Sequence, residues 1–332
     1  MYNVGIDVGS KELVMVIRHK GKNHKARTFN NTPEGHAKIV KTLSSKKGCV
    51  KICLEATGVY HFDLAVALNH ADLSLMVVNP KAAKHYFEAL MTRSKTDQVD
   101  AGILAQYVET MPFEAWQMPD EKIIQLQAFS RKIAALTKLK TQTKNQLHAL
   151  ESNRAVPAII QEETLDSIAF FEKQIQRLKE HALALIDSDE KLQRSFEIVT
   201  SVKGIAEASA IQLLGELLVL PENMKNRQWV AFAGLDPRHH KSGTSVSKKP
   251  KISKAGNSYL RQALYMPALC AANRDSHVKA YYQHLIDDQG LKKMQALCAV
   301  MRKLLHAIHA MLKNNVSFDN TRFFNMAETE IL

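Results

Sequence analysis

The chain has 332 residues, which is long enough for two or three domains. With a hydrophobic content of 45% it can bury a sizeable core, so we do not expect it to be disordered. Its 45 basic and 33 acidic residues give a formal charge of +12, which favours a polyanionic partner such as nucleic acid. No apolar run approaches the roughly 18 residues of a membrane span, and the N-terminus enters a strand pattern directly, so we expect a cytoplasmic protein without membrane segments.

The first 110 or so residues alternate between strand and helix patterns. The segments IDVGS, ELVMVIRH and ARTFN predict a meander of strands, with a turn at residues 20–23. A helix from Pro33, the strand VKICLE, a helix over residues 62–69 and the strand LSLMVVN follow, and a helix-rich segment covers residues 81–109. This order matches the core of a ribonuclease H fold.

Two acids are predicted to lie on strands of this core. Asp7 lies between apolar residues that alternate along the first strand, which places its carboxylate on the face opposite those core residues. Glu55 ends the strand VKICLE. Asp7, which is soon followed by Gly9, could alone be an ordinary residue at a strand-to-turn transition.

Two further acids begin a predicted helix. Asp97 and Asp100 lie three residues apart, with Ser94 or Thr96 available as the helix N-cap, so both carboxylates project from one helical face. Asp97 alone could simply supply negative charge at a helix N-terminus. Acids on two strands and a helix together suit Mg²⁺, which can activate a nucleophile and stabilise a leaving oxygen, so the combination favours phosphodiester chemistry.

A different class of protein begins in the same way. Sugar-kinase and actin-like ATPases open with a similar acid- and glycine-containing hairpin, in which the turn holds a phosphate. They also need a second glycine-rich phosphate loop, but residues 101–200 contain no glycine except Gly102. The nuclease interpretation therefore ranks above the ATPase interpretation.

From about Asp120 the pattern changes to long helices with the alternating spacing of a coiled coil. The apolar positions are Leu126, Phe129, Ile133, Leu136, Leu147 and Leu150, and, after a break at residues 153–157, Ile168, Phe171, Ile175, Leu178, Ala182 and Leu185. A helical hairpin within one chain and a seam between two chains both satisfy this pattern, because heptads specify a partner helix and not whose helix it is.

Residues 196–217 resemble a helix-hairpin-helix, with a tight turn at Gly204 between helices over residues 196–202 and 207–217. Such turns direct backbone amides toward a phosphate and need glycine for close approach, so Lys203 and Gly204 are predicted nucleic-acid contacts. An ordinary helix connection that contains a glycine fits the sequence equally well.

The most one-sided stretch is residues 237–274, which contain no acid and eight basic residues, two-thirds of the net charge. Interspersed glycines and serines predict a flexible loop over its first half, suited to closing on a sugar-phosphate backbone. A solvated basic loop is the simpler alternative. The predicted nucleic-acid contacts in this stretch are Arg238, Lys241, Gly243, Lys248, Lys249, Lys251, Lys254 and Arg261.

These features occur together in a known family. The segments LEATGVYH and SKTDQVDA closely resemble the DEDD transposases of the insertion sequence 110 family, relatives of the Piv-type DNA invertases. The downstream pattern of Ser242-Gly243, Lys254 to Gly256 and Leu260-Arg261 resembles the same family. The resemblance spans nearly the whole chain.

The resemblance implies a mixed α/β and α-helical recombinase. Its expected parts are a RuvC-like domain over residues 1–115 that holds Mg²⁺ through Asp7, Glu55, Asp97 and Asp100, a coiled-coil segment over residues 116–190, and a mostly helical transposase domain over residues 191–332. Ser242 matches the family's nucleophile, which becomes linked to a DNA phosphate in a site built from two subunits of a dimer or tetramer. A noncoding bridge RNA pairs with donor and target DNA in that family and supplies the choice of sequence.

Three functional hypotheses follow. The first is an RNA-guided, Mg²⁺-dependent serine recombinase that moves a mobile element. The second is a RuvC-like, structure-specific endonuclease in which water cuts the strand and Ser242 only contacts phosphate; a covalent protein–DNA adduct separates it from the first. The third is a nucleic-acid-binding protein without catalysis, whose acids are structural. A transposase and a site-specific invertase both remain open.

Overall fold

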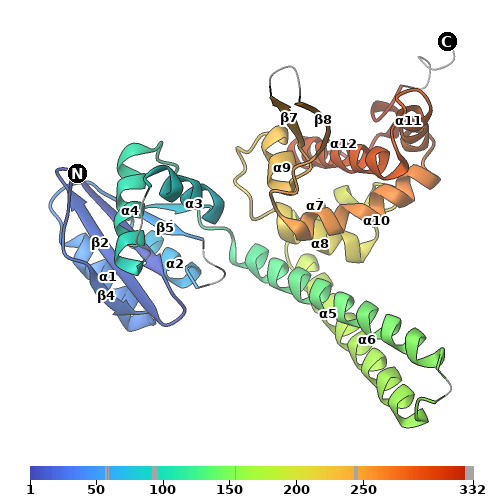
Figure 1. The fold of residues 1–332 in the computed structure, drawn as a ribbon, viewed down its shortest axis with the longest axis horizontal. Coiled ribbons are helices and arrows are strands. Elements are labelled where there is room, and N and C mark those ends of the chain that lie inside the picture. The colour runs from blue at the N-terminus through green and yellow to red at the C-terminus, as the bar shows by residue number, and fades with distance from the viewer. Residues whose placement is uncertain (57, 59, 92–95, 154, 243–245, 326–332) are drawn as a thin grey trace. The chain divides into compact units, whose positions relative to one another are not determined.

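The computed structural model divides the chain into two compact units, Met1–Met118 and Pro119–Leu332 (Figure 1). The structure describes the chain except for residues 57, 59, 92–95, 154, 243–245 and 326–332, and it describes residues 239–242 and 246–250 by their backbone alone. None of the helices in these described parts is long and apolar enough to cross a membrane.

The first unit is built on one mixed sheet, six-stranded within the described residues. Its strands are β1 (Tyr2–Val8), β2 (Glu12–His19), β3 (Lys22–Asn23), β4 (Arg27–Asn30), β5 (Val50–Glu55) and β6 (Ser74–Val78). The order is β3-β2-β1-β5-β6, and β4 also pairs with β2. β1 is antiparallel to β2 but parallel to β5, and β5 is parallel to β6.

Helices cover both faces of this sheet, so the first unit has three layers (Figure 1). They are α1 (Pro33–Ser44), α2 (Phe62–His70), α3 (Pro80–Ala89) and α4 (Asp97–Thr110). Ile6 of β1 shares a core with Leu43 of α1 and Leu68 of α2. On the opposite face, Cys53 of β5 packs in a second core with Leu104 of α4. The order of strands and helices predicted for this part of the chain is confirmed.

The second unit begins with two long helices, α5 (Glu121–Glu151) and α6 (Ala158–Asp187), which form an antiparallel hairpin (Figure 1). The rings of Phe129 and His181 stack with their centroids 6.4 Å apart. Nearer the tip, the Nζ atom of Lys144 lies 3.0 Å from a carboxylate oxygen of Glu172. The apolar heptad positions of each helix therefore have a partner helix within the same chain.

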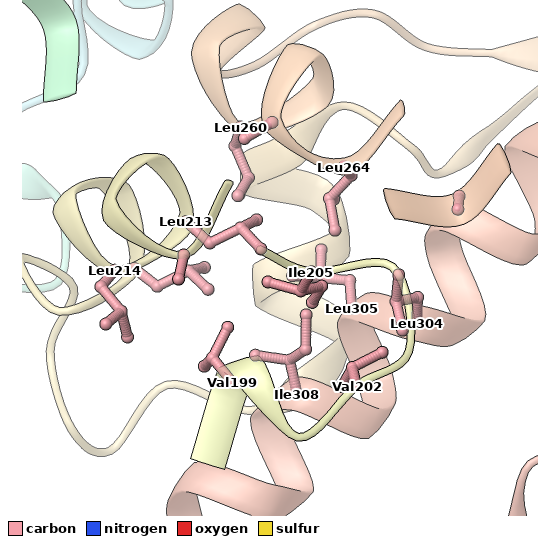
Figure 2. Packing of buried hydrophobic residues seen from close by; sticks show 14 of the residues in the cluster. Val199, Val202, Ile205, Leu213, Leu214, Leu260, Leu264, Leu304, Leu305 and Ile308 are labelled. Carbon is pink, nitrogen blue, oxygen red and sulfur yellow. The ribbon is translucent and has the colours of Figure 1, made fainter. Parts of the chain in front are cut away.

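The remaining helices of the second unit are α7 (Glu190–Thr200), α8 (Glu207–Leu217), α9 (Asn226–Ala233), α10 (Ser258–Arg274), α11 (Ser276–Asp287), α12 (Lys293–Asn314) and the short 3₁₀ helix η1 (Asn320–Arg322). Figure 2 shows their shared core, in which Leu213 of α8, Leu264 of α10 and Leu305 of α12 come together. Val202 and Ile205, in the turn between α7 and α8, enter the same core, so packing fixes this turn.

The segment that we expected to be a flexible loop is instead a pair of strands. β7 (Pro237–Ser242) and β8 (Val246–Ile252) pair antiparallel, with a register shift between Arg238 and His240. Pro250 lies at this irregularity, where its missing N–H removes no regular ladder bond. The expectation was wrong because the strands are joined by backbone pairing, which a sequence rich in serine, glycine and lysine does not reveal.

Candidate active site and nucleic-acid interface

The strand register brings two of the predicted acids together. Ile6 of β1 is opposite Leu54 of the parallel strand β5, so Asp7 and Glu55 follow side by side at the same end of the sheet. Ile6 and Leu54 both enter the core on one sheet face. Because side chains alternate along a strand, both carboxylates lie on the other face, which α4 covers.

The first turn of α4 supplies the other two acids. Thr96 is the N-cap, and its hydroxyl accepts a hydrogen bond of 3.3 Å from the backbone N–H of Val99. Asp97 and Asp100 are the acidic residues of that first turn, as predicted, and the alternative cap Ser94 lies outside the described residues. The charge of both acids is favourable at this end of a helix, because the helix macrodipole is positive there.

A glycine lets the backbone of α4 lie directly against β1, on the strand face that carries Asp7. Gly5 is on the same strand face as Asp7, and a Cβ atom added to it would overlap the carbonyl oxygen of Ala101 and the amide nitrogen of Ala105. It would also lie 2.8 Å from the Cβ atom of Leu104. The backbone of α4 therefore rests directly on β1, two residues from Asp7.

The environment of Asp7 shows that the acids influence one another. The pKa of Asp7 is raised from 3.8 to about 6, first by burial and then by the negative charges of Asp97, Asp100 and Glu55, in that order. A hydrogen bond from the backbone of Val8 opposes this rise. The surroundings of Asp7 thus disfavour its ionised form. Carboxylates with such raised pKa values are common at functional sites, where a bound cation can balance the negative charge.

The acids suit a divalent cation in their chemistry. Within the described residues, no three carboxylate, thiol or imidazole groups lie close enough together to hold one ion. The donors are nevertheless all hard oxygens, and their mutual repulsion creates a negative potential that bound Mg²⁺ would relieve. Asp7, Glu55, Asp97 and Asp100 therefore suit such an ion by the type of their ligand atoms, and their role as its ligands stays a prediction.

Ser242, the predicted nucleophile, is in the second unit. It is the last residue of β7, and its backbone is opposite Val246 of β8. Gly243, which follows it, lies outside the described residues. The acids and the serine thus belong to different compact units of the chain.

The base of the β7–β8 hairpin is fixed by backbone hydrogen bonds to the end of α9. The N–H of Ser253 donates to the carbonyl of Asp236 at 2.8 Å, and the N–H of Asn257 donates to the carbonyl of Phe232 at 2.7 Å. A Cβ atom on Gly256 would overlap that same carbonyl of Phe232. The hydroxyl of Ser253 also donates to the carboxylate of Asp236 at 2.6 Å. The residues that flank the hairpin on both sides therefore hold it at a defined place.

A buried carboxylate ties this base to the long hairpin. Glu216 of α8 is 0% exposed and accepts two hydrogen bonds from the guanidinium group of Arg131 in α5, at 2.8 and 3.1 Å. The side-chain amide of Asn257 donates to the same carboxylate at 2.6 Å. These bonds satisfy a buried charge that would be costly alone, so they join α5, α8 and the start of α10.

The basic residues that we predicted as nucleic-acid contacts differ in how the structure describes them. Lys203, Arg238, Lys251 and Lys254 are exposed. Lys241, Lys248 and Lys249 lie on β7 and β8, for which only the backbone is described. The side chains of the four exposed residues take part in no hydrogen bond or ion pair among the described residues, so their charges face solvent.

Gly204 and Arg261 have structural contacts. Gly204 has φ +107°, and a Cβ atom on it would lie 2.9 Å from the carbonyl oxygen of Pro267 in α10. Its close approach is therefore to another helix. The guanidinium group of Arg261 donates to the carbonyls of Ala233 and Gly256, at 2.9 and 3.1 Å. Both residues support the hairpin and the helices around it.

Four residues that support the site were not predicted from the sequence: Gly5, Glu216, Arg131 and Asn257. The first two have a sequence feature that could have indicated their role. Gly5 interrupts an apolar strand, and glycine within a strand often marks close approach of another backbone. Glu216 is a lone charge in the apolar helix AIQLLGELL, which is typical of a buried, paired acid. Arg131 and Asn257 carry no such signal, because their partner is remote in sequence.

Two family models match the chain. A DEDD transposase model of IS110 elements matches residues 4–150, and a model of the transposase IS116/IS110/IS902 family matches residues 196–283. The chain belongs to the IS110 family of transposases. Membership in the IS110 family makes it an enzyme of DNA transposition or recombination, with DNA as its partner. The resemblance found in the sequence is thereby confirmed.

Individual relatives agree with this membership. The chain is 28% identical over 297 residues to the pilin gene-inverting protein of Moraxella bovis, an alignment that covers 88% of this chain and 90% of that protein. The pilin gene-inverting protein of Moraxella lacunata is similar to the same extent. A probable family 20 transposase of Pseudomonas aeruginosa is 30% identical over 128 residues, 37% of this chain and 36% of the relative.

Proposed function

We propose that this IS110-family enzyme cuts and rejoins DNA through Ser242, assisted by Mg²⁺ held by Asp7, Glu55, Asp97 and Asp100. The observation that carries the proposal is that half-buried Asp7 feels the negative charges of Asp97, Asp100 and Glu55: its pKa is about 6, raised first by burial and then by this mutual repulsion. Purely structural acids would gain nothing from this mutual repulsion, and a glycine that admits α4 onto β1 brings it about.

The proposed chemistry is a phosphoryl transfer to the serine. Attack of the Ser242 hydroxyl oxygen on a DNA phosphorus forms a serine phosphate ester and breaks one bond from that phosphorus to a deoxyribose oxygen. The proton lost by the serine is balanced by the proton that the departing deoxyribose oxygen gains. A new deoxyribose hydroxyl then reverses the step on a different strand, so the ester's energy is conserved and no nucleotide cofactor is consumed.

The chain's own residues would contribute position and charge. Mg²⁺, when bound, would stabilise charge on the transferred phosphate. The basic residues of the β7–β8 hairpin would hold the DNA backbone beside Ser242, in the manner of phosphate contacts that position without specifying sequence. Ser253 and Asn257 would fix the hairpin on α9 through the hydrogen bonds already described. His61, His239 and His240 are not assigned a role.

We assign the parts of the chain accordingly. Residues 1–115 would be the RuvC-like catalytic domain, and the sheet order, with one antiparallel and two parallel pairings around β1 and β5, supports this assignment. Residues 116–190 would be the coiled-coil segment. Residues 191–332 would be the transposase domain, and the turn at Gly204 would make it a helix-hairpin-helix domain.

The partners beyond DNA are also part of the proposal. A bridge RNA that pairs with donor and target DNA would choose the sites, and the net charge of +12 suits two nucleic-acid partners. A dimer or tetramer would form along the α5–α6 hairpin, because large apolar residues remain exposed toward its tip. These residues are Leu139, Ile159, Ile160, Leu165 and Phe170.

The decisive experiment is detection of the covalent intermediate. The purified protein is incubated with Mg²⁺, the RNA transcribed from its flanking DNA, and labelled element-junction DNA, then separated on a denaturing gel and mapped by peptide mass. We expect an adduct on Ser242 that is lost in Ser242→Ala and in Asp100→Asn. Ser247→Ala and Asp63→Asn, which change a serine of β8 and an exposed acid of α2, should retain it.

The proposal has one alternative for its chemistry and one for its biological outcome. A RuvC-like, structure-specific endonuclease would cut the same DNA with water and leave no adduct, and the convergent acids would suit it equally. A site-specific invertase would form the adduct but exchange strands within one DNA molecule. The pilin gene-inverting relatives favour keeping this second possibility.

A further inference from the structure

The helix that follows the basic hairpin has an unusual exposed face. α10 buries Leu260, Leu264 and Ala268 in the core of the second unit, and Figure 2 labels the first two pointing into it. Its opposite face carries large side chains that remain open to solvent. They are Tyr259, Tyr265 and Met266, whose exposed fractions are 40%, 36% and 54%.

These exposed residues share one side of the helix. Tyr259 and Met266 are seven residues apart, two full helical turns, and the polar residue Gln262 lies between them at a spacing of three from Tyr259. Tyr265 flanks the same stripe. The α10 stripe, defined as Tyr259, Gln262, Tyr265 and Met266, thus offers two aromatic rings and a thioether without any charge.

One ring of the stripe is held by an anchored cation. The guanidinium carbon of Arg131 lies 5.3 Å from the centroid of the Tyr259 ring. Arg131 is itself fixed by its two hydrogen bonds to the buried carboxylate of Glu216. The ring therefore has little freedom to lose when a flat ligand stacks on it, which favours binding.

The charge around the stripe indicates what the ligand is. The chain from residue 237 to residue 274, which includes the hairpin and all of α10, has eight basic residues and no acid. An exposed apolar stripe for a protein partner would not need this one-sided charge. Aromatic rings beside an acid-free basic segment are the combination that binds unpaired nucleic acid, because bases stack on the rings and phosphates contact the cations.

We infer that the α10 stripe stacks the bases of an unpaired DNA strand next to the phosphate that Ser242 attacks. The inference rests on the proposed function, because it takes the strand on α10 to be continuous with the strand on the hairpin. The hydrogen bond from Asn257 to Phe232 and the N-cap of α10 formed by the same residue place both elements at one corner of the unit. Duplex DNA has no free base faces and gains nothing from the stripe.

The test compares the binding of unpaired and paired DNA by the full-length protein. Fluorescence anisotropy is measured with a labelled 20-nucleotide deoxythymidine strand and with a duplex of the same length, at one fixed salt concentration. Tyr259→Ala and Tyr265→Ala should each weaken binding of the single strand roughly tenfold, the scale of one base–aromatic stack, and change duplex binding less than twofold. Tyr259→Phe and Tyr265→Phe, which keep the ring, should bind like the wild type.

Two methionines give a matched control. Met266→Ala removes part of the stripe, whereas Met294→Ala removes a side chain of almost equal exposure, 55%, at the start of α12. Only the first should weaken binding of the single strand. Thermal unfolding of each variant checks that a loss of binding is not a loss of structure.

Other results would overturn the inference. Equal losses for single strand and duplex would make the stripe a general DNA contact. A larger loss for an RNA strand of the same length would make it a guide-RNA surface, and a changed sedimentation coefficient with unchanged DNA binding would make it a subunit interface. Adduct formation on Ser242 is measured in parallel: if it is absent while single-strand binding still depends on Tyr259, the proposed function fails and the stacking surface stands.

Discussion

At the scale of single residues, Asp7 gives the clearest prediction, because its raised pKa has a direct consequence for stability. The folded protein holds the proton of Asp7 up to about pH 6, whereas the unfolded chain loses it near 3.8. Raising the pH between these values therefore destabilises the metal-free protein, and above pH 6 the cost is complete. This carboxylate lowers stability at the pH at which the enzyme would work.

Replacing Asp7 by Asn should accordingly stabilise the metal-free protein at pH 8, by about 1 kcal/mol after allowance for solvent screening, and abolish adduct formation. At pH 4 the gain should vanish, since Asp7 is then protonated in the wild type. Added Mg²⁺ should raise the unfolding temperature of the wild type but not of Asp7→Asn. Urea unfolding with a chelator measures the first effect, and thermal unfolding with and without Mg²⁺ measures the second. A destabilised variant at pH 8 would contradict the assignment.

Gly5 gives a second prediction at this scale. Gly5→Ala should destabilise the first unit by about 3 kcal/mol, because the new methyl group overlaps the backbone of α4, which cannot move alone. Gly102→Ala, in α4 itself, is the matched control. Its methyl group would meet only the side chain of Asn23, at 2.9 Å, and the higher helix propensity of alanine favours the substitution by up to about 1 kcal/mol. Chemical unfolding distinguishes them, and equal effects would show that α4 does not need its close contact with β1.

The residue scale also shows how far the sequence could predict the site. Asp7, Glu55, Asp97 and Asp100 could be proposed from the sequence because each acid lies within the last or first few residues of a predicted strand or helix. Gly5 could not be recognised as the residue that unites them, because the helix that it admits lies almost a hundred residues away. Contacts between remote segments leave little trace in local patterns.

At the scale of elements, the base of the β7–β8 hairpin should control catalysis more than binding. Asn257→Ala removes the N-cap of α10 and one hydrogen bond to Glu216, which we expect to cost about 2 kcal/mol and to slow adduct formation at least tenfold. DNA affinity should change little, because the basic residues remain. Asn273→Ala, which removes only a hydrogen bond to Leu269 within α10, is the control. An equal loss of activity in Asn273→Ala would show that the base of the hairpin has no special role in catalysis.

The exposed tip of the α5–α6 hairpin gives the other prediction at this scale. Leu165 and Phe170 are 52% and 58% exposed on α6, so replacing both with Glu should prevent association while leaving the fold intact. Sedimentation should then report a smaller species than the wild type. Lys173→Glu, an exposed change on the same helix, should not alter the assembly, and unchanged sedimentation of the double variant would place the subunit interface elsewhere.

The elements were predictable to different degrees for a physical reason. Strands and helices of the first unit, and the two long helices, bury one face each, so their periodicity is visible. The β7–β8 hairpin is a two-stranded sheet that is held by its ladder and by bonds to residues 232–236, and nothing in its own residues alternates. The sequence of this segment therefore predicts a loop.

At the scale of the whole molecule, the separation of the acids and the serine into two compact units is the central fact. A site made within one chain and a site shared between two chains use the same residues, so neither the sequence patterns nor the individual units decide between them. Complementation between inactive variants does decide. Asp100→Asn lacks a working acid cluster but keeps Ser242, and Ser242→Ala lacks the serine but keeps the acids.

Mixed dimers of these two variants should regain activity if the acids of one subunit serve the serine of the other. One of the two sites in each mixed dimer then combines intact acids with an intact serine, whereas the other combines both defects. Random pairing makes about half of the dimers mixed, so co-expressed variants should form about a quarter of the wild-type amount of adduct. The adduct should map to the Asp100→Asn chain alone, which isotope labelling of one variant can establish. If each chain instead used its own acids and serine, the mixture would form no adduct at all, since every chain would carry a defect in its only site.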